Sequence, residues 1–407
     1  MTNTIPTPSS TPSITHAVTP SAMPADPVAA ATHADPYPYY AALRLGAPLA
    51  WNERLRLWVA SRADVIEQVL QAHGALRVRP AAEPVPRAIA GSPAGEVFGH
   101  LIRMNDGAAH SAHRPALQRA LAGLDLDAVY ASALQVAQRV QQQQGQQPLS
   151  DTLFSMPVQS VAHLLGFADD VLPQVDHWMR DFVACLSPLS TPDQLQRASQ
   201  AASQLMVRFE ALAAGTAPRH GTLLAAVLAE SASDAALSRS LLANLAGLLS
   251  QTCEATAGLV GNSLIALMRD PSLRPSARTR DGLQAIAEET ARHDPSVQNT
   301  RRFAAEAVTI AGADVAAGDT VLVLLASANR DPAFNPEPDR FMPLRERRRM
   351  LGFGHGMHAC PGQALACTLA AASLQALLQQ HAADLDAQRL RGWSYRPSVN
   401  GRIPVFH

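Results

Sequence analysis

The segment FGHGMHACPG, residues 353–362, is the most informative stretch of the sequence. Cys360 stands between a glycine-rich turn and the expected start of a helix, where the helix N-terminus favours a thiolate. Glycines without side chains allow the backbone to approach a large flat ligand closely; here they are Gly354, Gly356 and Gly362. A thiolate presented in this way suits an axial bond to haem iron. The same cysteine without these neighbours would indicate a buried structural residue.

Composition excludes several classes of protein. The chain has 407 residues, 47% of them hydrophobic, which is enough for a large core. Its formal net charge is −1, so no overall field attracts nucleic acid or an acidic membrane, and we expect no nucleic-acid partner. The four cysteines are too few and too widely spaced for a disulfide scaffold, which favours a cytoplasmic location. No apolar stretch reaches the roughly 18 residues of a membrane span, so no membrane anchor is expected.

The chain divides into two parts. Residues 1–34 are rich in Pro, Ser and Thr and lack the features of a signal peptide, which predicts a disordered leader. Residues 35–407 have globular patterning in which helices dominate and strand patterns come late. The longest helical pattern ends before Pro271 and carries polar residues in the middle of an apolar run. Such groups are costly in a buried helix unless they are paired or used. We expect a mostly α fold with a single domain over residues 35–407.

The loop resembles the haem-binding signature of the cytochrome P450 family, F-x-x-G-x-H-x-C-x-G. Five residues match it: Phe353, Gly356, His358, Cys360 and Gly362. The resemblance covers most of the chain from about residue 35 onward.

Other family motifs occur in the same order along the chain. Glu289 and Arg292 match the E-x-x-R motif, and Arg340 fits the third member of its ion-pair network. His110 and Arg114 match the H-x-x-x-R of the helix that passes a haem propionate. Taken alone, Glu289 and Arg292 are more typical of a surface ion pair, and His110 and Arg114 of a solvated helix face, than of a cofactor site. Their joint occurrence at the family's spacing makes the resemblance specific.

The resemblance implies a fold, a cofactor and an activity. The fold is the triangular, mostly helical cytochrome P450 fold with small β-sheets. The cofactor is haem b, with Cys360 as the iron ligand. Its propionates are expected to be held by His110, Arg114, Arg301 and His358. Phe353, Gly354, Gly356 and Gly362 complete the expected cofactor site.

The implied enzyme is an oxidoreductase, a monooxygenase that activates O₂ and oxidises a small to medium, largely apolar molecule. Its electrons come from a separate partner, which we expect to be a ferredoxin served by a ferredoxin reductase. The segment RERRR, residues 345–349, is an expected docking site for an acidic ferredoxin, although a solvated loop accounts for it equally well. Pocket walls are expected from residues 75–103, the region around Phe182, the helix from 245 to 252, and residues 296–300.

One departure from the family concerns the central helix, which usually reads A-G-x-E/D-T. Setting Gly261 and Asn262 on the family's G-N pair places residues 251–256 on this motif. The acid is then Glu254, but Ala255 stands where the alcohol is expected.

The missing alcohol normally helps to deliver a proton beside the bound O₂. We expect Thr252 or Gln251, one turn back on nearly the same face, or a hydroxyl of the substrate to supply it. Thr256 is a weaker candidate because it is rotated by about 100° from Ala255. The alternative is a haem-thiolate enzyme that uses peroxide or performs no oxygenation.

Overall fold

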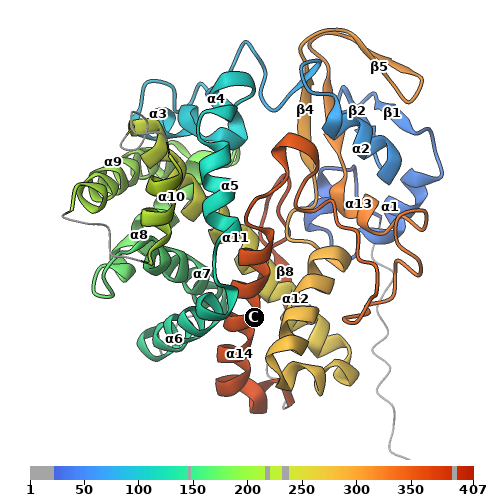
Figure 1. The fold of residues 1–407 in the computed structure, drawn as a ribbon. Helices are drawn as coiled ribbons and strands as arrows, with labels where there is room; N and C mark the ends of the chain where they lie inside the picture. Colours follow the sequence, from blue (N-terminus) through green and yellow to red (C-terminus); the bar gives the residue numbers. More distant parts are fainter. Residues whose placement is uncertain (1–22, 145–147, 216–220, 232–237, 387–391) are drawn as a thin grey trace, which may run out of the picture.

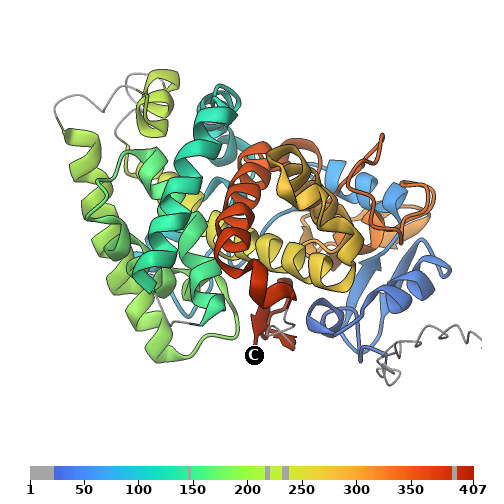
Figure 2. The same ribbon diagram turned by 90° about the horizontal axis from the view of Figure 1, so that it is seen from below.

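The computed structural model describes residues 23–144, 148–215, 221–231, 238–386 and 392–407 (Figure 1). Helices dominate these residues, and the strands form small sheets, so the predicted mostly α fold is confirmed. The helices α6, α8 and α9 lie on the left of Figure 1, whereas β1, β2 and β4 lie on the right. The view from below shows the same separation of the green helices from the blue N-terminal strands (Figure 2).

The α-helices are α1 (Tyr37–Arg44), α2 (Ala63–Gln71), α3 (Pro93–His100), α4 (Gly107–Ser111), α5 (Arg114–Ala122), α6 (Leu126–Gln144), α7 (Leu149–Leu165), α8 (Leu172–Phe182), α9 (Pro192–Ala214), α10 (Leu223–Glu230), α11 (Arg239–Arg269), α12 (Arg280–His293), α13 (Leu325–Asn329) and α14 (Gln363–Asp386). Short 3₁₀ helices are η1 (Ala29–Thr32), η2 (Ile102–Met104), η3 (Val183–Leu186), η4 (Pro271–Leu273), η5 (Ser276–Arg278) and η6 (Gly356–His358).

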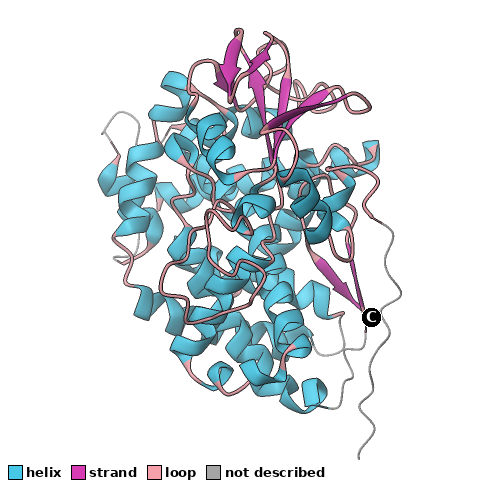
Figure 3. Cartoon of the chain, turned by 90° about the vertical axis from the view of Figure 1, so that its right-hand side faces the viewer, coloured by secondary structure: helices cyan, strands magenta, loops and turns pink. Residues whose placement is uncertain are grey.

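The strands are β1 (Leu49–Asn52), β2 (Leu57–Ala60), β3 (Leu76–Arg77), β4 (Thr300–Ala304), β5 (Val308–Ile310), β6 (Ala313–Val315), β7 (Thr320–Val323), β8 (Trp393–Tyr395) and β9 (Pro404–Phe406). The larger sheet has the order β1-β2-β7-β4-β3 and is antiparallel except between β2 and β7. Antiparallel pairs β5–β6 and β8–β9 form the other sheets. Figure 3 shows β8–β9 apart from the other strands, beside the C-terminus.

Helix α11 is the long central helix that the sequence predicted. It begins where the Ser238 hydroxyl accepts a hydrogen bond from the backbone N–H of Leu241, a typical N-cap. At about 1.5 Å per residue its 31 residues span roughly 45 Å. A Cβ at Gly261 would lie 2.4 Å from the Pro404 side chain, so a glycine is required for the β8–β9 hairpin to pack against α11.

One described stretch, residues 356–380, is long and apolar enough to cross a membrane by length and composition. Its most apolar window is 61% buried inside the protein, as is typical of a core helix. The sequence expectation that no stretch reaches this limit was therefore wrong. This stretch includes most of α14, which packs against α6, α11 and α12.

The N-terminal part of the described chain is packed against the domain. Residues 1–22 of the predicted leader lie outside the described residues, but residues 23–34 contain η1, in which Ala30 and Ala31 are fully buried. The packed chain thus begins before the expected boundary at residue 34. Small apolar side chains within the proline-rich composition, which the sequence analysis gave little weight, account for this difference.

Buried charges join the two ends of the described chain. Arg402, with a side chain only 1% exposed, donates from Nε to Asp294 Oδ1 at 2.7 Å. Its two Nη atoms donate to the carbonyl oxygens of His33 and Ala34. Asp294 also accepts a hydrogen bond from the Tyr37 hydroxyl at 2.5 Å. Burial alone raises the pKa of Asp294, but Arg402 and Tyr37 lower it, and the net shift of this pKa is downward.

Replacing Arg402 should strongly destabilise the protein. The Arg402→Met variant leaves Asp294 buried without its cation, which should lower the free energy of unfolding by about 3–5 kcal/mol. The control Arg62→Met removes an exposed pair with Asp64 and should cost about 0–1 kcal/mol. Because folding lowers the pKa of Asp294, the stability from this pair is present above about pH 4 and is lost on further acidification. Urea unfolding at several pH values measures both effects, and equal losses for the two variants would contradict the prediction.

Candidate functional site

The Cys360 loop is held by backbone contacts. The N–H of Cys360 donates to the carbonyl of Phe353 at 2.7 Å, and the Gly362 backbone hydrogen-bonds toward the thiol. Gly356 has φ +66°, and a Cβ there would lie 3.0 Å from His73 Nε2. Gly354 also has a positive φ, +77°. The positive φ values favour glycine at both positions, of which the motif fixes Gly356.

The Cys360 thiol is open to solvent on one side, yet protein surrounds much of its sulfur. This burial raises the pKa of Cys360, while the Gly362 hydrogen bond and the charge of Arg114 act in the opposite direction. The net shift of this pKa is thus upward, whereas the sequence analysis expected a lowered one at the helix N-terminus. A metal ion that coordinates a thiol deprotonates it outright.

Three of the predicted propionate-binding residues meet beside this loop. Arg114 donates to the carbonyl of Ala359, next to Cys360. The His110 and His358 rings lie 4.4 Å apart between centroids. Burial lowers the pKa of His110, and the charges of His358 and Arg114 lower it further. The predicted H-x-x-x-R pair and the loop histidine therefore share one site.

Asp106 is the acid of this site, and the motif analysis did not single it out. Its Oδ1 lies 3.0 Å from His358 Nε2, and its Oδ2 accepts a hydrogen bond from the N–H of Val78. Burial raises the pKa of Asp106, but the bonds from His358 and Val78 outweigh it and lower the pKa.

The arginine of β4 that faces this site is Arg302. Its charge acts on Asp106 and His73, whereas Arg301 has no corresponding interaction among the described groups. Side chains of successive residues in a strand point to opposite faces of the sheet, so Arg301 and Arg302 lie in different environments. The structure thus places Arg302, and not the predicted Arg301, beside Asp106, while the propionate role itself stays a prediction. Because Arg301 and Arg302 are adjacent in β4, the sequence alone did not indicate which of them faces the site.

The site fits a haem group. Basic side chains outnumber the one carboxylate, and the buried His110 Nε2 has no hydrogen-bond partner in the part of the chain that the structure describes. Buried polar atoms are rarely left unsatisfied in a finished structure. The two propionates of haem would supply acceptors for these donors through charge-assisted hydrogen bonds.

The E-x-x-R pair is buried. The side chains of Glu289 and Arg292 are fully buried, and Arg292 Nη2 lies 2.7 Å from Glu289 Oε1. Burial raises the pKa of Glu289, but the bonds from its arginine partners produce a net lowering. The surface-pair alternative is therefore wrong for these residues.

The third member of the network is not Arg340. The Arg340 side chain is exposed and binds Glu337; only its backbone carbonyl accepts a bond from Arg292. Arg345 and Arg348 reach Glu289 instead, with Nε to carboxylate distances of 3.4 and 3.1 Å. Both come from an irregular segment, in which sequence periodicity does not indicate where side chains point.

The predicted distal residues lie along the middle of α11. The Thr252 hydroxyl donates to the Leu248 carbonyl at 2.8 Å and the residue is buried. The Gln251 amide donates to the Gly247 carbonyl at 3.0 Å from an exposed position. Thr256 is 1% exposed. Helix hydrogen bonding thus occupies the hydroxyl and the amide one turn before Ala255.

Glu254 is bound by a residue that the sequence did not single out. Its carboxylate pairs with Arg396, from the turn after β8, at 2.5 Å. The two are 142 positions apart in the chain, and no short-range signal connects them.

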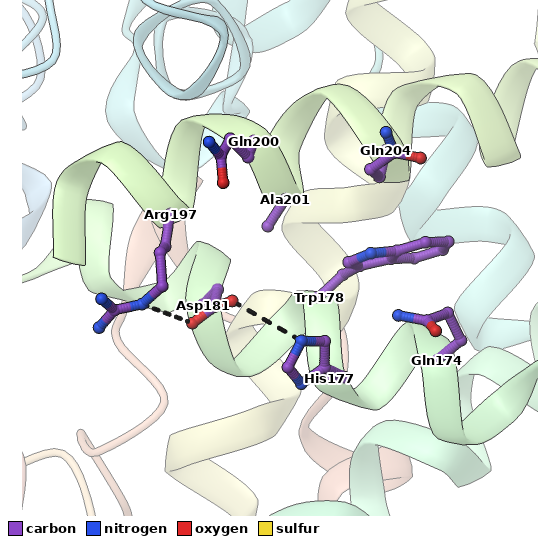
Figure 4. Close-up of a pocket in the computed structure, with 8 residues that line it drawn as sticks. All are labelled: Gln174, His177, Trp178, Asp181, Arg197, Gln200, Ala201 and Gln204. Atoms are coloured by element: carbon purple, nitrogen blue, oxygen red, sulfur yellow. Dashed lines mark ion pairs between the residues drawn. The ribbon is translucent and has the colours of Figure 1, made fainter. Parts of the chain in front are cut away.

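A polar groove of about 510 Å³ lies between α8 and α9 (Figure 4). In it Asp181 lies 3.4 Å from Arg197 and 4.0 Å from His177. None of the residues predicted for the haem or distal site lines this groove. It is therefore a separate surface feature.

Comparisons with known proteins agree with this geometry. The family model described as Cytochrome P450 matches residues 281–390. Cytochrome P450 133B2 of Xylella fastidiosa is 29% identical over 324 residues, which cover 76% of this chain and 80% of that protein. The cytochrome P450 monooxygenase PikC of Streptomyces venezuelae is 31% identical over 276 residues, 66% of this chain and 61% of that protein.

Solved structures show the same fold. The crystal structure of CalO2 has a TM-score of 0.77 and 26% identity, covering 92% of this chain and 96% of its own. P450BioI, in complex with an acyl carrier protein ligated to hexadec-9Z-enoic acid, has a TM-score of 0.73 and 22% identity, covering 91% and 98%.

Proposed function

Since the chain belongs to the cytochrome P450 family of haem-thiolate monooxygenases, we propose that Cys360 is the iron ligand of its haem b. The observation that carries this assignment is the unpartnered, buried His110 Nε2 beside Arg114, whose guanidinium reaches the backbone next to the cysteine. We propose that His110, Arg114, His358 and Arg302 hold the propionates, with Arg302 in place of Arg301.

Haem with a thiolate ligand supplies O₂ activation and the insertion of one oxygen atom into a substrate. The chain's own residues hold and orient it. Arg114 and Arg302 are permanent cations that neutralise carboxylates. Gly354 and Gly356 keep the loop compact beside the ligand cysteine, and Phe353 packs against the main core. The residues from 35 to 407 form one domain in this proposal.

Replacing Cys360 tests the ligand assignment. In Cys360→Ser the reduced protein under CO should lose the long-wavelength Soret band of thiolate-ligated haem, because no other thiolate is presented at this loop. Cys367→Ser is the matched control, since Cys367 is a buried residue of the following helix and its loss should leave the band in place. Optical spectra of the two reduced proteins measure the difference. Persistence of the band in Cys360→Ser would overturn the assignment.

We propose that a proton reaches the distal side through Thr252 or Gln251, or through a substrate hydroxyl. Thr252 is buried on α11, and rotation of its hydroxyl away from Leu248 would free its proton. Glu254 is half-buried and paired with Arg396, so it serves as an acid only when this pair opens. Thr256 remains the weaker candidate.

The coupling of NADH consumption to product formation tests this route. Thr252→Ala should lower the product formed per NADH, by up to about 100-fold if this hydroxyl is the main donor. Thr256→Ala tests the weaker candidate, and we expect it to lower coupling much less than Thr252→Ala. Full coupling in both Thr252→Ala and Gln251→Ala would exclude the helix as the proton source. If Ala255→Thr raises coupling while turnover with H₂O₂ falls, peroxide is the native oxidant of this chain.

We propose a ferredoxin and its reductase as the electron source, and a cytoplasmic location, where Cys185, Cys253 and Cys367 remain free thiols. Within the segment 345–349, Arg345 and Arg348 turn inward to Glu289. Arg347 is exposed and remains available to an acidic partner.

Charge reversal at Arg347 tests the docking surface. Arg347→Glu should slow reduction by an acidic ferredoxin about tenfold at low salt and weaken its salt dependence, because steering depends on complementary charge. Arg208→Glu, on the distant helix α9, is the control with the same charge change. Stopped-flow reduction at several salt concentrations measures the effect. An unchanged rate in Arg347→Glu, or equal slowing in both variants, would reject this surface.

The substrate is expected to be a small to medium, largely apolar molecule. Solved relatives bind ligands as different as hexadec-9Z-enoic acid on a carrier protein, testosterone and (4-ethylphenyl) dihydrogen phosphate. The choice of substrate therefore depends on the side chains of this chain's own pocket walls.

A further inference from the structure

Arg103 is a half-buried cation in a segment expected to wall the substrate pocket, and its Nε atom is fully buried. It lies in η2, directly after a segment that packs against α11: the N–H of Ile102 donates to the Asn244 side chain at 2.8 Å. Leu101 is fully buried and fills the space above Gly247, where a Cβ would lie 2.6 Å from its side chain. These contacts fix the backbone that carries Arg103.

The guanidinium of Arg103 has no bound acid among the described residues. Its Nε is buried without a hydrogen-bond partner, and no described carboxylate forms an ion pair with Arg103. Burial lowers the pKa of Arg103, and only the more distant Cys185 and Glu254 act against this shift. A cation that loses contact with water and gains no counterion is destabilised.

The groups that interact with Arg103 place it on the pocket side of the molecule. Cys185 belongs to η3, near the wall expected around Phe182, and Glu254 lies on α11 two residues after the expected wall 245–252. The β8–β9 hairpin adds Arg396, which already neutralises Glu254. Arg103, Arg396 and Glu254 therefore bring two positive charges and one negative charge to this region. Because Arg396 pairs with Glu254, no described carboxylate neutralises Arg103.

The haem propionates do not account for Arg103. The charges that act on His110, Arg114 and Asp106 belong to other residues of the haem cluster, and Arg103 is not among them. Conversely, no member of that cluster acts on Arg103. The two sets of charges are separate, although Asp106 follows Arg103 by only three positions.

Building on the proposed haem-thiolate function, we infer that Arg103 binds the oxyanion of an amphipathic substrate, a carboxylate or phosphate carried on an apolar body. A guanidinium binds either oxyanion through paired, charge-assisted hydrogen bonds. The apolar body would contact the leucines of α11, such as Leu245 and Leu249. This refines the largely apolar substrate expected from the sequence to one with a negatively charged end.

Matched probes test the inference with the ferric holoenzyme. Dodecanoate, dodecyl phosphate, dodecanol and methyl dodecanoate share one apolar chain and differ in the head group. Their dissociation constants follow from the low-spin to high-spin shift of the haem and from the rise in Tm. In the wild type at least one anion should bind about 10–100-fold more tightly than the alcohol and ester, as expected for a hydrogen bond to a charged group. Tighter binding of dodecanoate would identify the oxyanion as a carboxylate, and tighter binding of dodecyl phosphate would identify it as a phosphate.

Variants assign the preference to one residue. Arg103→Gln should abolish the preference and leave alcohol binding unchanged, whereas Arg103→Lys should retain part of it. Arg87→Gln, an exposed arginine of the same loop region, is the control and should behave as the wild type. The inference is overturned if no anion of the series binds preferentially, or if Arg103→Gln keeps the preference.

Thermal unfolding and the CO spectrum distinguish substrate binding by Arg103 from a structural role and from propionate binding. Without substrate, Arg103→Met should have a Tm equal to or above that of the wild type, because it removes an unpaired charge whose Nε is buried. A lower Tm would show a structural partner and contradict the inference. Loss of haem from Arg103→Gln would place the residue on a propionate and also contradict it. Failure of the proposed function would instead appear as an absent thiolate–CO band in the wild type.

Discussion

The buried carboxylate of Glu289 is the constraint on which the approach to the Cys360 loop depends. A charge without exposed surface is tolerated only if cations satisfy it, and removal of one partner leaves the rest uncompensated. Arg292 satisfies it from the same helix, while Arg345 and Arg348 reach it from the irregular segment that precedes the loop. This segment has little regular structure of its own. Its path to Cys360 is therefore fixed by the ion pairs that Arg345 and Arg348 form with Glu289.

Several cations lie beside the Cys360 loop, and one lies apart from them near α11. The chain is poor in charge, with 16% charged residues, yet cations gather beside the Cys360 loop and one stands alone near α11. Arg114 and Arg302 are the residues proposed to bind the two carboxylates of the cofactor, whereas Arg103 is proposed to bind a substrate. In both places an unsatisfied donor is the sign of a missing partner.

Much of the site was predictable because its residues lie in one loop or at helical spacing. Cys360 and His358 are close in sequence, and His110 and Arg114 are four residues apart. Assignments failed where a choice depended on three-dimensional pairing. Arg302 replaces Arg301 because the pleat of β4 decides which one faces the site, and no alternation of apolar residues marked that face. The prediction also named Arg340 where Arg345 and Arg348 bind Glu289. An irregular segment has no sequence period that indicates where its side chains point.

The tie between Arg402 and the backbone at residues 33 and 34 has a consequence for how the enzyme is handled. Arg402 immediately precedes the residues that lead into β9, and the hairpin it belongs to carries Arg396 toward Glu254 on α11. The backbone at residues 33 and 34 and the β8–β9 hairpin therefore hold each other in place, although 369 and 368 positions separate the bonded residues in the chain. Removing the chain through residue 34 would take two acceptors from the Arg402 guanidinium and would loosen the hairpin that carries Arg396.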